Sequence, residues 1–246
     1  MDAVAGPLGA PAIVFVHGTR VTHAVWTPQL TALADEFRTV AVDLPGHGTR
    51  ADQPFTLAGA ADVVGGAIDA LPGGRAIVVG LSLGGYVAMD LAARTPERVS
   101  GLVLAGATSE PVGAMRAPFL VFAWGLGTFS GAPIDAASRW YFERRFPPEV
   151  AGPIVAAGFW PRGGAQAVRA VARERFLPKL AAYPGRTLLI NGALDLPFRL
   201  GEGRFARVAT DARRVHLKGA THLSNLDRPV AFTAAVRSFA RSLEPS

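Results

Sequence analysis

One stretch of this chain, residues 76–93, constrains the fold more than any other. It opens with a short β-branched run, residues 76–79, which is typical of a strand buried on both faces. From Leu83 onward the stretch is rich in Ala, Leu and Met, and this composition favours a helix. Ser82 lies between the two in the pattern Gly-x-Ser-x-Gly, whose glycines allow neighbouring backbone to approach closely. We therefore expect a strand, a sharp turn and a helix, with the Ser82 hydroxyl exposed at the turn.

The pentapeptide alone is weak evidence, because the chain contains 28 Gly and such a pattern can arise by chance. The strand before it and the helix after it supply the context that a nucleophile elbow requires. A dinucleotide-binding loop needs Gly-x-Gly-x-x-Gly, but position 82 is serine. The lysine of a phosphate-binding loop is also absent from this turn. The motif therefore indicates a nucleophilic serine rather than a nucleotide site.

Bulk composition narrows the class of protein. With 246 residues, half of them apolar, the chain can form one α/β domain with a full core. It has no apolar run of about 18 residues, so no membrane span is expected. Its start lacks the pattern of a secretory signal, and without cysteine there is no disulfide framework, so we expect a cytoplasmic protein. The net charge is +6, but no basic run with interleaved aromatic residues predicts nucleic-acid binding.

Strand and helix patterns alternate through most of the chain. The residues before position 12 carry no pattern. Strands are expected at residues 12–16 and 39–43, from about residue 75 to the Ser82 turn, and at residues 99–105, 186–190 and 213–217. Helices are expected at residues 26–37, 57–71 (with Thr56 as the capping residue), 83–93 and 229–243. This alternation predicts a doubly wound, mostly parallel α/β sheet.

Residues 107–180 interrupt this rhythm, because they contain helical patterns but no convincing strand. We expect helices at residues 114–124, 135–146, 149–157 and 165–177. This predicts a core formed by residues 1–106 and 181–246, with residues 107–180 inserted as a helical cap. The cap is rich in aromatic residues, and we expect some of them to face Ser82 and bind substrate: Phe119, Phe122, Trp124, Trp140 and Phe159.

The same segment holds nine basic and five acidic residues. A solvated arginine-rich face is the favoured interpretation of this excess. The competing interpretation is an anionic substrate held by Arg139, Arg144 or Arg145. We expect a small-molecule substrate in either case.

Reactive residues follow several of the predicted strands. Ligands bind beyond the carboxyl ends of the strands in an open parallel sheet. Residues 17–19, Ser82, Asp195 and His222 all lie directly after strands, and they should therefore meet at one edge. The chain order Ser, Asp, His matches one known arrangement of a catalytic triad.

With these motifs in place, the chain resembles the α/β-hydrolase superfamily, and within it the capped branch of serine esterases, lactonases and carbon–carbon-bond hydrolases. The resemblance is carried by His17-Gly18, Asp43-Leu44-Pro45-Gly46-His47-Gly48, Gly80-Leu81-Ser82-Leu83-Gly84-Gly85, Gly192-Ala193-Leu194-Asp195 and Gly219-Ala220-Thr221-His222. These segments lie within residues 12–106 and 181–246. The cap is similar in position and helical character alone.

The resemblance implies a role for each of five residues. Ser82 is expected to attack, because an adjacent base can activate a serine hydroxyl. His222 would accept its proton, and Asp195 would hold the tautomer of the imidazole. The backbone N–H groups of Leu83 and Thr19 are expected to form the oxyanion hole.

Other residues compete for these roles. Glu110, just after a strand, is the one alternative acid. Among the other histidines, His17 and His47 are expected to support loops, and His216 to be a satisfied core residue. No His/Asp/Glu cluster has the spacing of a metal site, and no cofactor is expected.

Relatives normally begin with an antiparallel hairpin, whereas only eleven residues precede the first predicted strand here. We therefore expect a lost or shortened hairpin, or a truncated start.

The leading prediction is a serine hydrolase, monomeric or homodimeric, that acts on a small and largely apolar carboxylic ester or lactone. A carbon–carbon hydrolase, a lyase or a perhydrolase uses the same triad and is the alternative. A non-catalytic ligand receptor on the same fold is a third interpretation.

Overall fold

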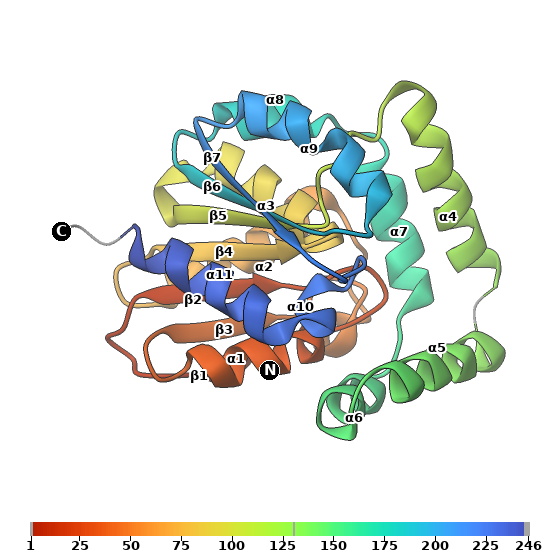
Figure 1. The fold of residues 1–246 in the computed structure, drawn as a ribbon. Coiled ribbons are helices and arrows are strands. Elements are labelled where there is room, and N and C mark those ends of the chain that lie inside the picture. The colour runs from red at the N-terminus through yellow and green to blue at the C-terminus, as the bar shows by residue number, and fades with distance from the viewer. Residues whose placement is uncertain (1, 130, 244–246) are drawn as a thin grey trace.

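The computed structural model describes residues 2–129 and 131–243, and these form one seven-stranded sheet between two layers of helices (Figure 1). In chain order the strands are β1 (Ala3–Ala5), β2 (Ala12–Val16), β3 (Arg38–Val42), β4 (Ala76–Leu81), β5 (Val99–Ala105), β6 (Arg186–Gly192) and β7 (Asp211–Leu217). Their order across the sheet is β1-β3-β2-β4-β5-β6-β7. Neighbouring strands are parallel throughout except for β1, which pairs antiparallel with β3. The predicted mostly parallel sheet is confirmed.

The helices follow the predicted alternation, with the nucleophile motif at the junction of β4 and α3. The α-helices are α1 (Thr27–Leu33), α2 (Leu57–Asp69), α3 (Leu83–Arg94), α4 (Arg116–Thr128), α5 (Ala132–Arg145), α6 (Pro148–Ala157), α7 (Pro161–Val171), α8 (Phe176–Ala182), α9 (Leu196–Val208), α10 (Ser224–Asp227) and α11 (Pro229–Arg241). Short 3₁₀ turns are η1 (His23–Trp26), η2 (Gly48–Arg50), η3 (Pro96–Arg98) and η4 (Gly113–Met115). Thr56 caps α2 as predicted, because its side chain accepts a hydrogen bond from the Gly59 N–H at 3.0 Å.

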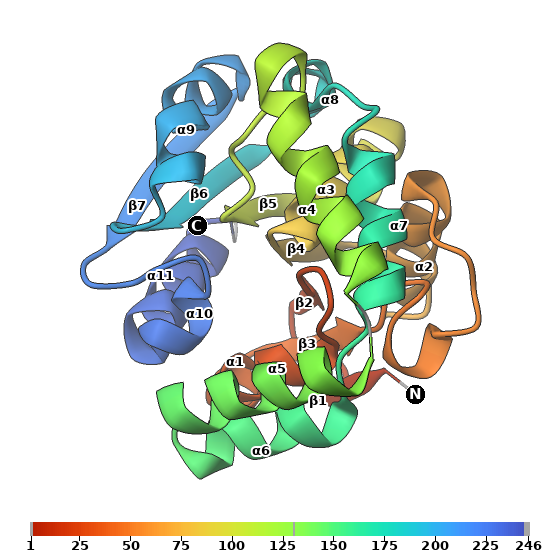
Figure 2. The same ribbon diagram turned by 90° about the vertical axis from the view of Figure 1, so that its right-hand side faces the viewer.

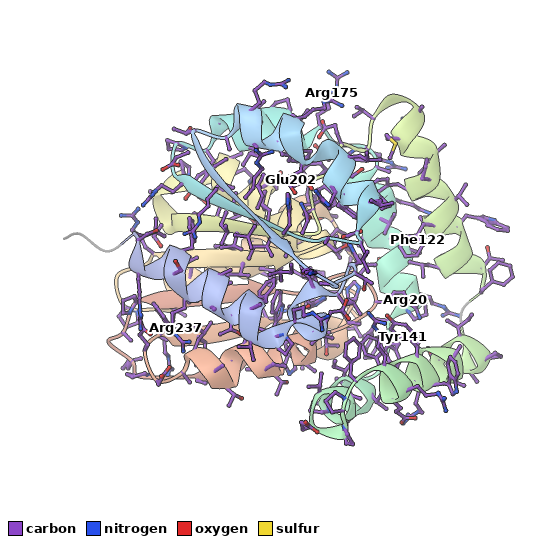
Figure 3. The ribbon with its side chains drawn as sticks, in the orientation of Figure 1. Arg20, Phe122, Tyr141, Arg175, Glu202 and Arg237 are labelled. Carbon is purple, nitrogen blue, oxygen red and sulfur yellow. The ribbon has the colours of Figure 1, made fainter. Side chains whose placement is uncertain are left out.

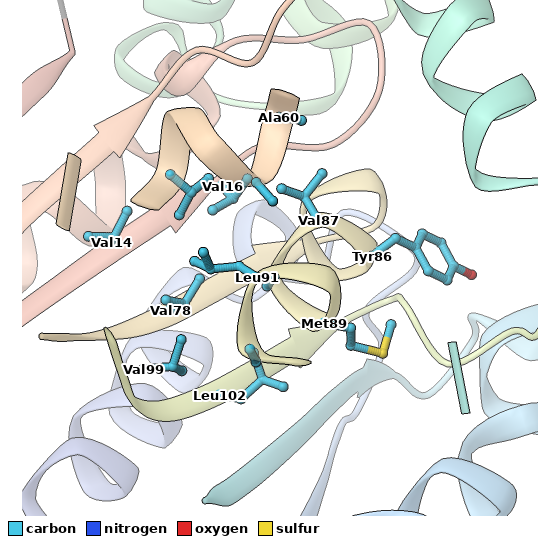
Figure 4. Close-up of a cluster of buried hydrophobic side chains, with 14 of the residues drawn as sticks. Val14, Val16, Ala60, Val78, Tyr86, Val87, Met89, Leu91, Val99 and Leu102 are labelled. Carbon is cyan, nitrogen blue, oxygen red and sulfur yellow. The ribbon is translucent and has the colours of Figure 1, made fainter. Parts of the chain in front are cut away.

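The two faces of the sheet bury separate hydrophobic clusters. Alternate residues of each strand point to opposite faces, so Val14 and Val78 pack on one side and Phe15 on the other. The first cluster is closed by α2, α3 and α8, and Figure 4 shows Val14 and Val78 beside Val87 and Leu91 of α3. The second is closed by α1 and α11. Burial on both faces explains the continuous apolar runs of β2 and β4.

Helices α4 to α7, here called the cap helices, connect the two halves of the sheet. Figures 1 and 2 show α4 and α7 beyond the carboxyl ends of the central strands, with α5 and α6 to one side. Helix α8 lies against α3 and α9, so the predicted cap boundary at residue 180 falls inside an element of the core layer. Ser130 of the cap segment, Met1 and residues 244–246 lie outside the described residues.

Within residues 2–129 and 131–243, no single helix is long and apolar enough to cross a membrane. Residues 113–128 and α5 meet those criteria only together, across a bend of 113°.

The start of the chain contains β1, a three-residue strand that pairs antiparallel with β3 and is too short to leave a sequence pattern; this agrees with the expectation of a shortened hairpin. Two other local expectations are wrong. The helix expected at residues 26–37 is divided into η1 and the shorter α1. The helix expected at residues 165–177 is also divided, because α7 ends at Val171 and α8 begins at Phe176. The cause of the second break is a distant carboxylate, which is described with the site below.

Candidate active site

The Ser82 turn has the geometry that its sequence predicts. Ser82 has φ 52° and ψ −114° and stands between β4 and the first residue of α3. A Cβ on Gly80 would lie 2.3 Å from the Gly84 carbonyl oxygen, and a Cβ on Gly84 would lie 2.1 Å from the Val16 carbonyl oxygen. Both glycines are therefore required by the close approach of backbone. The Ser82 N–H donates to the Ala105 carbonyl at 2.7 Å, which ties the turn to β5.

Asp195 and His222 come together from the ends of β6 and β7, the two strands beyond β5 in the sheet. Asp195 follows β6 and is buried, and His222 follows β7. The distance from His222 Nδ1 to Asp195 Oδ2 is 2.8 Å. The Phe198 ring stacks on the imidazole with 4.7 Å between ring centroids. A carboxylate and an aromatic ring thus fix the orientation of His222.

Gly106 is a feature of this pair that the sequence analysis missed. It follows β5 with φ +56°, and a Cβ there would lie 2.9 Å from His222 Cε1 and 3.3 Å from Asp195 Oδ2. The absent side chain of Gly106 therefore makes room for the His222–Asp195 contact. The only signal in the sequence is a glycine directly after a predicted strand.

Ser82 and His222 line one cavity of about 330 Å³, here called the nucleophile cavity. The hydrogen bonds within residues 2–129 and 131–243 do not include one between Ser82 Oγ and His222. In unliganded enzymes such contacts are often long, and they tighten when substrate binds. Ser82 and His222 therefore share one cavity, and Asp195 contacts His222 without lining that cavity.

The two backbone N–H groups predicted for the oxyanion hole are available. Thr19 and Leu83 both line the nucleophile cavity. Leu83 is the first residue of α3, where a backbone N–H has no intrahelical acceptor. Neither N–H has an acceptor among the described residues. The N-terminal end of α3 adds a favourable dipole for negative charge at Leu83.

Two neutral histidines hold the loop that carries Thr19. The distance from His17 Nδ1 to the Gly18 carbonyl is 2.7 Å, and its Nε2 accepts from the Leu44 N–H at 2.9 Å. His47 Nε2 accepts from the Arg20 N–H at 3.3 Å. Burial lowers the pKa of His17 to about 3 and that of His47 to about 4, so both stay neutral at neutral pH. Their contacts support the loop, as the sequence predicted.

The rest of the nucleophile cavity is almost entirely apolar. Turn η4, helix α4, helix α7 and the start of α9 supply its apolar side chains. They are Met115, Pro118, Phe119, Phe122, Val168, Val171, Pro197 and Phe198. Two of the predicted aromatic residues, Phe119 and Phe122, therefore lie where they were expected.

Three other predicted aromatic residues lie elsewhere. Trp124 is 57% exposed and Trp140 is 63% exposed, and neither lines the nucleophile cavity. Trp124 follows Phe119 by five residues, which places it about 140° around the helix. Phe159 lines the adjacent cavity described next. The expectation that the two tryptophans face Ser82 is therefore wrong.

The adjacent cavity, here called the Arg20 cavity, has a volume of about 470 Å³ and lies between the Thr19 loop and α5. It shares Thr19, Phe122 and His222 with the nucleophile cavity. Figure 3 shows Arg20 between Phe122 of α4 and Tyr141 of α5, and all three line this cavity. The two cavities are thus neighbouring parts of one site, with Phe122 between them.

Glu110, the competing acid, has another partner. Its carboxylate is 7% exposed and accepts the N–H groups of Phe176 at 3.0 Å and Leu177 at 3.1 Å. These are orphan donors at the start of α8. Burial raises the pKa of Glu110. This carboxylate therefore starts α8 and explains the break after α7.

The remaining histidines also have partners away from Ser82. His23 Nδ1 lies 2.8 Å from Asp43 Oδ1. His216 Nε2 lies 2.8 Å from Glu202 Oε1, and its side chain is partly exposed rather than in the core. Within the described part of the chain, no group of three His, Cys, Asp or Glu residues could hold a metal ion.

Comparisons with known proteins agree with this architecture. A family model described as "Alpha/beta hydrolase family" matches residues 13–236. The chain is similar to 3-oxoadipate enol-lactonase 1 of Acinetobacter baylyi, with 28% identity over 97% of this chain and 92% of the relative. It is similar to the pimeloyl-[acyl-carrier protein] methyl ester esterase of Neisseria meningitidis serogroup A, with 30% identity over 95% and 78%.

Among solved structures, the enol-lactonase from Burkholderia xenovorans LB400 is similar, with a TM-score of 0.81 and 27% identity. The likeness covers 98% of this chain and 96% of that one. These relatives are hydrolases of esters or lactones by name. The protein therefore belongs to the α/β-hydrolase family, and it is a hydrolase.

Proposed function

We propose that the protein is a serine hydrolase that uses Ser82, His222 and Asp195 on a small carboxylic ester or lactone. The observation that carries the proposal is the 2.8 Å contact between His222 and Asp195 on the cavity lined by Ser82. The names of the relatives support the ester and lactone class. Residues 107–180 are proposed to act as a cap that covers this cavity, with α8 packed on the core.

Acylation begins with attack of Ser82 Oγ on the ester carbonyl carbon. His222 Nε2 takes the hydroxyl proton while its Nδ1–H donates to Asp195, which stabilises the imidazolium. The carbonyl oxygen becomes an oxyanion and accepts hydrogen bonds from the backbone N–H groups of Leu83 and Thr19. Collapse of this intermediate breaks the bond to the alcohol oxygen, which receives the proton from His222.

Deacylation repeats these steps with water as the nucleophile. His222 takes a proton from the water as it attacks the acyl carbon, and then returns that proton to Ser82 Oγ. These steps regenerate the free serine and release a carboxylic acid and an alcohol. A lactone gives a single hydroxy acid, because its acyl and alcohol parts belong to one molecule.

The dimensions of the nucleophile cavity limit the substrate. About 330 Å³ of apolar space accommodates a short or medium acyl chain but not a long triglyceride. The cap helices reduce access of bulk water, which strengthens the hydrogen bonds to a developing oxyanion.

The test is a chain-length series of p-nitrophenyl esters together with γ- and δ-lactones, assayed with the wild type and with Ser82→Ala. We expect turnover of short and medium substrates and loss of turnover in the variant, which should keep its unfolding midpoint. Tight retention of a ligand without turnover in the wild type would instead favour the receptor interpretation. Cleavage of a carbon–carbon bond without ester turnover would favour the alternative chemistry.

A further inference from the structure

Arg20 is a cation in the site that forms no salt bridge with any of the described residues. Its guanidinium donates from Nη2 to Ser138 Oγ, which is a neutral acceptor. Its Nε is buried and has no hydrogen-bond partner. No carboxylate oxygen of residues 2–129 and 131–243 lies within 4.0 Å of it, although Asp135 acts on it from farther away. Burial also lowers the pKa of Arg20, which nevertheless remains charged at neutral pH.

The backbone of Arg20 is held in an uncommon conformation. Within the described residues, Arg20 (φ 70°) and Ser82 (φ 52°) are the two non-glycine residues with positive φ. This left-handed conformation is unfavourable for any residue with a Cβ, and it persists where surrounding contacts impose it. Those contacts are the hydrogen bond from the Arg20 N–H to His47 and the one from the Trp160 N–H to the Arg20 carbonyl at 2.8 Å.

Arg20 directly follows Thr19, the proposed oxyanion donor, in the sequence. The imposed backbone conformation therefore fixes the position of the Arg20 guanidinium beside the oxyanion hole. This guanidinium lies in the cavity that shares Phe122 and His222 with the nucleophile cavity (Figure 3). Arg20 is partly buried, and its buried Nε–H group is costly to leave unpaired unless an acceptor reaches it. A carboxylate is the acceptor that best matches its planar fork of donors.

The arginines of the cap do not compete for this role. Arg145 pairs with Asp227 at 2.6 Å and so joins α5 to the core. Arg139 lies 3.7 Å from Glu143 on the exposed side of α5, and Arg144 lies over the Trp140 ring. None of the three lines the nucleophile cavity or the Arg20 cavity.

We propose that the Arg20 cavity is an anion subsite, and that the natural substrate is an ester or lactone bearing a carboxylate that binds the Arg20 guanidinium. This inference rests on the proposed function, because the subsite acts only beside a reactive Ser82. The substrate then has two ends. Its apolar part occupies the nucleophile cavity under Phe119, and its carboxylate occupies the Arg20 cavity beyond Phe122.

The test compares methyl half esters of dicarboxylic acids, from succinate to suberate, with their neutral dimethyl esters. The readout is the ratio of kcat/KM for each half ester to that for its diester. O-Butyryl glycolate and its methyl ester form a second pair, in which the carboxylate lies on the alcohol side. We expect the wild type to prefer the charged member in at least one pair.

In Arg20→Gln this ratio should fall by roughly tenfold to a hundredfold, the range expected for one charge-assisted contact. Arg20→Lys should restore part of it. Arg139→Gln, a matched loss of charge on the exposed face of α5, should leave the ratio at the wild-type value. The free dicarboxylate should inhibit the wild type competitively, with a weaker inhibition constant in Arg20→Gln.

A purely structural role for Arg20 makes a different prediction. If Arg20 only joins the Thr19 loop to α5, Arg20→Gln lowers kcat/KM for charged and neutral esters equally, and the ratio stays constant. That result would overturn the proposal. Asp135→Asn also distinguishes the anion subsite from a purely structural role. Removal of this nearby negative charge should raise the ratio of kcat/KM for half ester to diester if Arg20 binds a carboxylate. A wild type that hydrolyses neither ester would instead contradict the proposed function itself.

Discussion

At the scale of single residues, Gly106 sets the position of His222 through the side chain that it lacks. In Gly106→Ala the new methyl group meets the imidazole at 2.9 Å and displaces it from Asp195. We expect kcat to fall by about 10²-fold, since a shift of about 1 Å in a reacting group has that effect. The measurement is kcat for a short ester, beside the unfolding free energy.

Gly74→Ala is the control for backbone strain. Gly74 has φ +59°, close to that of Gly106, but nothing lies within 4 Å of its would-be Cβ. It should lose stability and keep kcat. A Gly106→Ala enzyme with the kcat of the wild type would contradict the assignment of His222.

Substitution of Asp195 and of Glu110, the two candidates for the acid of the triad, should have different effects on kcat and on stability. Asp195→Asn removes the acceptor that holds the His222 tautomer, an effect of roughly 10⁴-fold in kcat in a well-studied serine protease. Glu110→Gln should keep kcat but lower the unfolding free energy by about 1–3 kcal/mol, because α8 loses a charged cap. Steady-state kinetics and urea titration on both variants give the ranking; the reverse ranking would move the acid to Glu110.

Sequence reasoning located Ser82, Asp195 and His222 because each follows a strand, and the ends of parallel strands meet at one edge. It did not find Gly106 or the role of Arg20. Their importance lies in distances to residues that are remote in the chain, and no periodicity records such distances.

At the scale of elements, α4 shows where a sequence pattern loses its meaning. The helix is apolar on nearly all sides, so its periodicity could not show which face lies toward Ser82. The structure places Phe122 between the two cavities and Trp124 on the outer surface.

Phe122→Ala should therefore change chain-length preference toward bulkier substrates, with a change of about fivefold or more in kcat/KM. Trp124→Ala removes a larger side chain from the same helix and should change kcat/KM by less than about twofold. Parallel assays over the p-nitrophenyl ester series provide the comparison. A larger effect of Trp124→Ala than of Phe122→Ala would place the substrate on the other face of α4.

The boundaries of other elements depend on contacts across the fold. The break between α7 and α8 follows from Glu110, which lies 66 residues before Phe176 in the chain. The three-residue β1 exists through its pairing with β3. The long strands and the helices of the core were predictable because their apolar pattern continues along the whole element. The α7–α8 break and β1 were not predictable, because each depends on a contact with a distant part of the chain.

At the scale of the whole molecule, His17 and His47 couple folding to pH. In the folded protein the pKa of His17 is about 3 and that of His47 is about 4. In the unfolded chain both pKa values are about 6.5. Below pH 6.5 the unfolded chain binds more protons, so their contribution to stability is complete above that pH and is lost toward pH 4 to 3. The unfolding free energy should fall by about 4 kcal/mol between pH 7 and pH 5.

Urea titrations at pH 7, 6 and 5 measure this slope, in a range where most carboxyl groups stay ionised. His47→Gln keeps an acceptor for the Arg20 N–H and should reduce the slope by about half. A wild-type unfolding free energy that stays constant from pH 7 to pH 5 would show that these histidines are not buried in their neutral form.

Ser82 is proposed as the nucleophile of this hydrolase, and covalent labelling tests that assignment most directly. The enzyme is treated with a serine-directed phosphonate ester, and the adduct is located by peptide mass spectrometry while residual activity is followed. We predict one adduct per chain, on the peptide that contains Ser82, formed in step with loss of activity and absent in Ser82→Ala. An adduct on another residue, or labelling that persists in Ser82→Ala, would contradict the account.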